Sequence, residues 1–147
     1  MRILLSCAKC EGIAKERQYR AELQDNGLYS LVCDNGHETA TCLLEQKFEV
    51  LFDLALYAIV DGYYREAVTS FTSCLERFYE FYVNVICIKH KISENIYEKT
   101  LKKVMKQSER QLGAYLFVYL LDNMTSPKLL SESQVSFRND VIHKGKI

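Results

Sequence analysis

From residue 43 onward the chain carries apolar residues at helical spacing. The first stripe marks one face of a helix and consists of Phe48, Leu51, Phe52, Ala55 and Ile59. Asp61 and Gly62 interrupt this pattern. A second stripe continues in steps of three and four residues from Tyr64 to Ile86. It predicts a helix on the order of 40 Å long at about 1.5 Å per residue, which is typical of a helical bundle.

Two further helices complete the expected bundle. Ser93 is suited to cap a third helix, whose apolar residues extend from Ile96 to Tyr119. A loop that contains the only proline follows at residues 123–128. Ser131 and Gln134 then have the spacing of a capping box, which predicts the start of a fourth helix. The pattern therefore predicts a mainly α fold, with a four-helix bundle over residues 43–147.

Residues 1–42 follow a different pattern of short alternating stretches. Gln18 to Leu23 and Leu28 to Val32 are predicted strands. Asp25-Asn26-Gly27 lies between them and supplies the positions of positive φ that a tight hairpin requires. We therefore expect a small β-hairpin module over residues 1–42, preceding the bundle.

Four residues of this module have the spacing of metal ligands. Two residues separate Cys7 from Cys10, three separate Cys33 from His37, and 22 lie between the pairs. Zinc favours four such sulfur and nitrogen ligands in a tetrahedron, and so small a region buries too little core to fold without a cross-link. The layout resembles a zinc ribbon that holds a structural Zn²⁺ ion. Cys42 is an alternative to His37 as the fourth ligand.

Other interpretations of the cysteines are weaker. A redox dithiol at Cys7 and Cys10 belongs in a βαβ context, which this pattern lacks, and unrelated thiols on a mobile N-terminus remain the simplest alternative. Cys74 and Cys87 fall within helical stretches and are expected to be core thiols.

The charge balance and the lengths of the apolar runs limit the expected partners and cellular location of the protein. Lys plus Arg and Asp plus Glu both number 19, so whole-chain electrostatics gives no reason to expect strong non-specific binding to nucleic acid. No apolar run reaches the roughly 18–20 residues that span a bilayer, and the apolar start from Met1 to Ser6 is too short for a signal peptide. We therefore expect a cytoplasmic protein without membrane association, in which disulfides are rare.

Two motifs in the helical region resemble the HEPN family. Arg138 is followed directly by Asn139 and, after four residues, by His143, in the last predicted helix. The stretch from Gly62 to Val68 reads Gly-Tyr-Tyr-Arg-Glu-Ala-Val, which is similar to a stretch in the long helices of that family. The resemblance covers residues 43–147 and implies a HEPN-like bundle. Members usually continue with another helix after the histidine, so we expect either a partner that completes the bundle or a shortened form.

The residues of the last helix suit RNA cleavage. At about 100° per residue, Asn139 and His143 lie nearly in line one turn apart, with Arg138 on the neighbouring edge. An imidazole can take a proton from a ribose 2′-hydroxyl or give one to the leaving 5′-oxygen. A guanidinium can hold the phosphate and offset transition-state charge. We expect Asn139 to orient the imidazole or the phosphate, and Asp140 to set the tautomer of His143. No metal is required for this chemistry.

The resemblance also implies partners. Members of the family act as dimers through the helix that carries the motif, so we expect a homodimer, an RNA substrate and a role in phage defence or as a toxin, with an antitoxin or another defence protein as a possible partner. Two other functions fit the sequence: a non-catalytic dimeric binding module with a structural zinc ribbon, and a zinc-dependent nucleic-acid adaptor on a helical scaffold. The simplest alternative for Arg138 and His143 is a solvated basic C-terminus.

Overall fold

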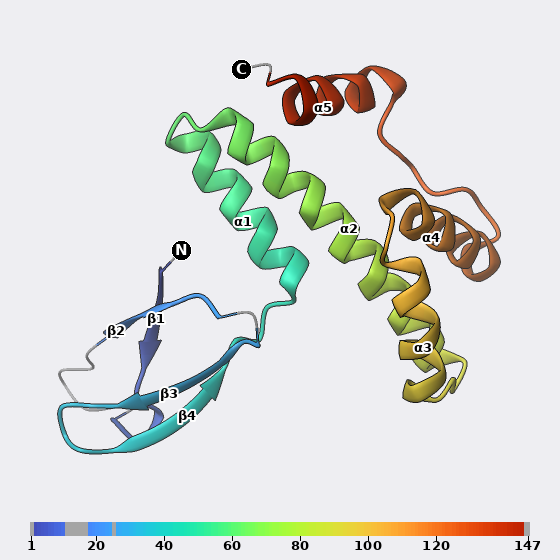
Figure 1. Ribbon diagram of the computed structural model, residues 1–147. Coiled ribbons are helices and arrows are strands. Elements are labelled where there is room, and N and C mark those ends of the chain that lie inside the picture. Colours follow the sequence, from blue (N-terminus) through green and yellow to red (C-terminus); the bar gives the residue numbers. More distant parts are fainter. Residues whose placement is uncertain (1, 11–17, 25, 146–147) are drawn as a thin grey trace. The chain divides into compact units, whose positions relative to one another are not determined.

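The computed structural model describes residues 2–10, 18–24 and 26–145 of the chain (Figure 1). The chain divides into two compact units, Met1–Gln46 and Lys47–Ile147, which we call unit 1 and unit 2. The described part of unit 1 contains four strands and one short 3-10 helix, and that of unit 2 contains five α-helices. The predicted mainly α fold, preceded by a small β module, is therefore confirmed. No helix in the described ranges is long and apolar enough to cross a membrane.

Unit 1 consists of two antiparallel hairpins. Its elements are β1 (Arg2–Ser6), the 3-10 helix η1 (Ala8–Cys10), β2 (Gln18–Glu22), β3 (Leu28–Val32) and β4 (Glu38–Cys42). β1 pairs with β2, and β3 pairs with β4. Along β3 the side chains alternate, so that Tyr29 and Leu31 are buried while their neighbours are exposed. The buried Leu31 packs with Cys7, Cys10 and Cys33, which makes the cysteines the greater part of this small core.

The predicted hairpin between the second and third strands is wrong in its pairing. β2 and β3 are both present, but they belong to different sheets, and the Asn26-Gly27 segment connects the sheets. Gly27 has a φ of +62°, and the Asn26 side chain accepts a hydrogen bond from the N–H of Leu28, so the turn itself is real. Asp25 lies outside the described residues. The physical reason is that each cysteine-containing segment lies between the two strands of one hairpin, so β1 pairs with β2 and β3 with β4, although fewer residues separate β2 from β3 than β1 from β2.

Unit 2 is built on one long helix. Its elements are α1 (Lys47–Val60), α2 (Tyr64–Lys89), α3 (Glu94–Val104), α4 (Ser108–Asn123) and α5 (Glu132–Lys144). The predicted break at Asp61-Gly62 is confirmed, and Gly62 has a φ of +80° in the turn between α1 and α2. Figure 1 shows α1 and α2 as an antiparallel pair. α2 also packs against α4 and α5, so it contacts three of the other four described helices closely.

The predicted third helix is wrong, because the structure divides it into α3 and α4. The break lies at Met105–Gln107. No apolar residue of the helical stripe falls between Val104 and Leu112, so this stretch has little to bury. Polar side chains then bind the backbone where α3 ends: Arg110 donates to the carbonyl of Lys103, and Gln111 to that of Met105.

α2 and α4 run parallel to each other. Three cross-links between them follow the same order along both helices, and they join Glu76 to Ser108, Glu80 to Gln111, and Lys89 to Asp122. The chain must therefore travel back along α2 before α4 begins, and α3 lies in this return segment.

An aromatic cluster forms the centre of unit 2. Tyr115 of α4 stacks on Tyr79 with ring centroids 4.6 Å apart, and it lies 5.3 Å from Tyr82 and 5.9 Å from Phe78 of α2. The Tyr115 side chain is only 6% exposed. The tyrosines of these two helices thus serve as core residues, as the helical stripe indicates.

We expect Tyr115→Ala to lower the free energy of unfolding of unit 2 by about 3 kcal/mol or more, because it removes a buried aromatic ring and leaves a cavity. Phe117→Ala is the matched control: this neighbour on α4 is 70% exposed, so we expect a change within about 0.5 kcal/mol. Urea denaturation followed by helical circular dichroism measures both. Equal changes for the two variants would contradict the central position of Tyr115.

Candidate functional site

The two cysteine-containing segments each present a pair of side chains from a tight turn. In the first, Cys7 follows β1 and Cys10 ends η1, and the N–H of Cys10 donates to the carbonyl of Cys7 at 2.9 Å. In the second, Cys33 follows β3, and the N–H of Gly36 donates to its carbonyl at 2.8 Å. Gly36 has a φ of +76°, which favours glycine at this position. His37 directly precedes β4.

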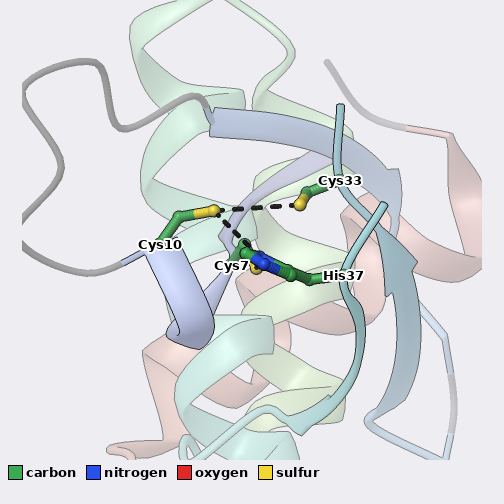
Figure 2. A group of neighbouring side chains, drawn as sticks. All are labelled: Cys7, Cys10, Cys33 and His37. Atoms are coloured by element: carbon green, nitrogen blue, oxygen red, sulfur yellow. Dashed lines mark hydrogen bonds between the residues drawn. The ribbon is translucent and has the colours of Figure 1, made fainter. Parts of the chain in front are cut away.

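The two pairs converge on one point (Figure 2). All four ligand atoms lie within 4.8 Å of one another. The Cys10 and Cys33 sulfurs are 3.8 Å apart, and Nδ1 of His37 lies 3.3 Å from the Cys10 sulfur and 3.9 Å from that of Cys7. Around a tetrahedral zinc ion with Zn–S bonds of about 2.3 Å, two thiolate sulfurs lie about 3.8 Å apart. The geometry and the donor set are therefore compatible with a metal site.

The site is enclosed and its loops are held in place. Cys7, Cys10 and Cys33 are 2%, 6% and 5% exposed. The amide of Asn35 donates to the Cys10 sulfur at 3.3 Å, which supports a negative thiolate at that position. The Tyr19 hydroxyl of β2 accepts a hydrogen bond from the N–H of Asp34 at 3.0 Å, which links the first hairpin to the second loop. With four protein ligands no position is left for a substrate, so such a site is structural.

The pKa values of Cys10 and Cys33 are shifted in opposite directions. The Asn35 amide lowers the pKa of Cys10, but burial and the neighbouring thiols of Cys33 and Cys7 outweigh it, and the pKa is raised. Burial acts to raise the pKa of Cys33, but hydrogen bonds from the backbone of His37 and Asn35 and from the neighbouring thiols lower it. Metal ligation requires thiolates, so loading this site releases protons.

The structure brings His37, and not Cys42, to the fourth position. Cys42 is exposed at the end of β4, opposite Leu28, whereas His37 lies at the other end of the same strand. The remaining cysteines lie in α2, where Cys74 is buried and Cys87 is half-buried. Burial raises the pKa of both thiols.

The residues of the Arg–His motif lie on α5. Its capping box is confirmed, because the Ser131 hydroxyl accepts from the N–H of Gln134 and the Gln134 side chain accepts from the N–H of Ser131. Val141 is buried on the inner side of the helix. Arg138 is half-buried, and its Nε and Nη2 donate to the Asn139 side-chain oxygen at 3.1 and 2.8 Å.

Arg138 and Asn139 border a pocket of about 390 Å³ between α2, α4 and α5. The pocket has polar groups from each helix: Glu76 and Tyr79 of α2, Ser108 of α4, and the two α5 side chains. The pKa of Tyr79 is raised by burial and, to a lesser extent, by Glu76, while Arg138 opposes the shift. The Arg138 guanidinium thus lies close enough to Tyr79 to influence it electrostatically.

His143 and Asp140 lie further along the same helix. His143 is exposed in the last turn of α5. Asp140 forms an ion pair with Lys144 at 2.7 Å, one turn ahead. The expected action of Asp140 on the imidazole stays a prediction. The structure therefore pairs Arg138 with Asn139 at the pocket and places His143 at the surface.

Some residues of these sites were not expected from the sequence. Asn35 and Tyr19 support the metal-ligand cluster, and only the Asn-Gly turn signal within the second loop could have indicated the first of them. Glu76, Tyr79 and Ser108 reach the pocket beside Arg138 through helix packing, for which no local pattern exists.

Comparison with known proteins adds no relative: no family model, curated protein or solved structure matches the chain.

Proposed function

We propose that unit 2 is a metal-independent endoribonuclease of the HEPN type, and that unit 1 binds a structural Zn²⁺ ion. The observation that supports the nuclease is the arrangement on α5. The guanidinium of Arg138 is oriented by Asn139 at the border of a polar pocket, and His143 is exposed one turn beyond Asn139 on the same helix. The Cys₃His donor set and its spacing support zinc.

These groups have the properties that RNA cleavage requires. The His143 imidazole takes the proton from a ribose 2′-hydroxyl, whose oxygen then attacks the adjacent phosphorus. Arg138 binds the phosphate and stabilises the charge that develops on its oxygens. The bond to the 5′-oxygen breaks, and that oxygen receives a proton, which leaves a 2′,3′-cyclic phosphate and a 5′-hydroxyl.

A homodimer accounts for both proton transfers. One histidine cannot serve readily as base and acid in the same step, so the copy of His143 in a second subunit supplies the second group. Its exposure on α5 leaves it accessible to such a partner. Unit 1 would then position RNA or respond to an activating partner, such as an antitoxin or another defence protein.

The test is cleavage of total RNA by the purified full chain in buffer with EDTA, with the zinc content measured afterwards to verify that unit 1 is intact. We expect His143→Ala to lower the cleavage rate by about 10²–10⁴-fold, the usual contribution of a general acid–base group. Mass spectrometry should find 2′,3′-cyclic phosphate ends in the wild-type products. The matched control is His90→Ala, which removes another exposed histidine at the end of α2 and should leave the rate unchanged. Absence of cleavage by the wild type, or equal rates for both variants, would reject the nuclease.

A second candidate, a non-catalytic dimeric binding module, is favoured by one surface. Phe117 and Leu121 share one side of α4 and are 70% and 71% exposed, and Met124, which directly follows the helix, is 81% exposed. Apolar side chains gathered in this way mark interaction surfaces. A dimer without cleavage in the experiment above would select this function over the nuclease.

A further inference from the structure

A cluster of basic side chains lies on α3 and at the start of α4, and we call it the basic ridge. It consists of Lys99, Lys102 and Lys103 of α3, Lys106 in the turn that follows, and Arg110 in the first turn of α4. All five residues are exposed. The segment 99–110 contains only one acidic residue, Glu109. The ridge therefore concentrates positive charge in a chain whose net charge is zero.

The five cations form one surface. At about 100° per residue, Lys99, Lys102 and Lys103 fall within a third of the circumference of α3. The guanidinium of Arg110 donates to the backbone carbonyl of Lys103 at 3.3 Å, which brings its charge to the end of the same helix. None of the five side chains forms an ion pair within the described part of the chain. Their charges are therefore available to a partner.

The opposite side of α3 is already used inside unit 2. Tyr97, Leu101 and Val104 are half-buried and line an apolar groove between α2, α3 and α4. The Tyr97 hydroxyl also donates to the carbonyl of Glu80 in α2 at 3.4 Å. A basic helix that lies on a membrane inserts its apolar side into the lipid, and the apolar side of α3 packs on its own protein. The ridge therefore suits a polyanion in solution better than a lipid surface.

The spacing of the charges resembles that of a nucleic-acid strand. Lys99 and Lys106 are seven residues apart, which is about 10 Å at 1.5 Å per residue. The four lysines over this length give one cation per roughly 3.5 Å, and a strand of a nucleic-acid helix carries about one phosphate per 3.4 Å of its axis. The ridge therefore has a charge density comparable to that of a polynucleotide backbone.

The start of α4 connects the ridge with the pocket beside Arg138. Ser108 borders that pocket, and its hydroxyl donates to Oε1 of Glu76 at 2.5 Å. Arg110 lies in the same turn of α4 as Ser108 and contacts the end of α3. A strand that has one phosphate at Arg138 can therefore continue past the start of α4 onto the ridge.

We propose that the basic ridge binds the sugar–phosphate backbone of a single-stranded RNA whose cleaved phosphate lies at Arg138. The assignment of the strand as RNA rests on the proposed function, whereas the assignment as a polyphosphate rests on the charges of the ridge. Lysine ammonium groups bind phosphates as flexible point charges and do not read bases. The ridge thus raises the affinity for RNA of any sequence.

Fluorescence anisotropy of the full chain with a labelled 2′-O-methyl RNA strand tests this proposal. The probe lacks the attacking hydroxyl, so binding is measured whether or not the protein cleaves RNA. The ridge variant carries Lys99→Gln, Lys102→Gln and Lys103→Gln. We expect it to bind about tenfold more weakly or less at physiological salt, because each lost phosphate contact lowers affinity at any sequence. The slope of log affinity against log salt should fall by about 2, at about 0.7 per phosphate contact.

A charge-matched variant separates the ridge from overall charge. Its three cations are exposed and lie elsewhere in the chain. They are Arg20, Arg65 and Lys128, each changed to Gln. This variant has the same net charge as the ridge variant and should bind the probe like the wild type.

A structural role of the lysines is tested separately. Lys102 and Lys103 lie in the last turn of α3, where cations also stabilise a helix. Changing the three α3 lysines to arginine keeps the charges and should keep the affinity. If the ridge variant does not fold, Lys99→Gln with Lys106→Gln replaces it, since both positions lie outside that turn.

Cleavable RNA shows whether the ridge serves the reaction. The ridge variant should raise KM and change kcat little, because its contacts are made equally before and during the reaction. Ridge-dependent binding without any cleavage would reject the nuclease and leave the ridge as a polyphosphate-binding surface.

Three results would overturn the proposal. One is the absence of probe binding by the folded wild type. Another is equal affinity of the ridge variant and the charge-matched variant. The third is tighter binding of a DNA strand of the same sequence, of polyglutamate or of phosphatidylserine vesicles, which would show that the partner was assigned wrongly.

Discussion

Replacing Cys33 with serine is expected to unfold unit 1 and to leave unit 2 folded. The core of unit 1 consists largely of Cys7, Cys10, Cys33 and Leu31, so the ligands themselves are most of what is buried. Each of its sheets has only two strands, and isolated two-stranded hairpins are at best marginally stable in water. Structural zinc contributes about 10–16 kcal/mol in small zinc-binding peptides. If unit 1 binds zinc as proposed, loss of one thiolate removes much of this contribution, and little else holds the hairpins together.

Amide NMR spectra resolve the two units in one sample. In Cys33→Ser we expect the dispersed signals of β1 to β4 to collapse, the helical signals to persist, and the zinc content of the purified protein to fall to near zero. Cys42→Ser is the matched control, because this thiol is exposed and lies outside the ligand cluster. A zinc-free Cys33→Ser protein that keeps its dispersed strand signals would show that unit 1 folds without the metal.

The second large effect is expected at Arg138. If unit 2 cleaves RNA as proposed, Arg138→Ala should lower the cleavage rate by about 10²–10³-fold, as does the loss of one preorganised donor to a developing negative charge. The guanidinium is already oriented by two hydrogen bonds to Asn139, so little ordering is needed when the phosphate arrives. Arg138→Lys should recover only part of the rate, since an ammonium group cannot bind phosphate in the bidentate way.

Arg138 is half-buried, so its role in folding must be separated from its role in the reaction. Thermal unfolding of each variant shows whether the substitution destabilises the fold, independently of its effect on the cleavage rate. Arg65→Ala removes an exposed arginine near the start of α2 and should preserve the rate. An Arg138→Ala protein that folds normally and cleaves at the wild-type rate would remove this residue from the proposed site.

The parts of the fold that the sequence predicted correctly are those with a local cause. The break at Gly62 and the capping box at Ser131 depend on residues within one turn of each other, and both are confirmed. The pairing of the strands depends on contacts that no local pattern encodes. The turn at Asn26-Gly27 exists, yet it connects two sheets instead of closing a hairpin. Similarly, the prediction of a single helix from Ile96 to Tyr119 gave too little weight to the polar stretch that separates α3 from α4.

The candidate sites were likewise predicted correctly only where their residues are close in sequence. The spacing of the cysteines and His37 predicted a ligand cluster because each pair lies within one tight turn, and the structure selects His37 over the alternative Cys42. The pocket beside Arg138 includes Tyr79 and Ser108, which are distant in sequence and meet only because α2 and α4 pack in parallel. The relation between Arg138 and His143 depends on the angular position of each residue on α5, which the sequence predicts only approximately.

The way the ligands are distributed between the two hairpins has a consequence for metal uptake. Each hairpin holds two ligands that are close in sequence, so either pair can capture an ion at a small cost in chain entropy. Only the joining of the two half-sites closes a long loop. Once one half-site holds the ion, the other competes for it as a tethered ligand at a high effective concentration. We therefore expect the metal to bind in two kinetic steps, first to one ligand pair and then to both. The intermediate in which only one pair holds the ion should be short-lived and should not accumulate at equilibrium.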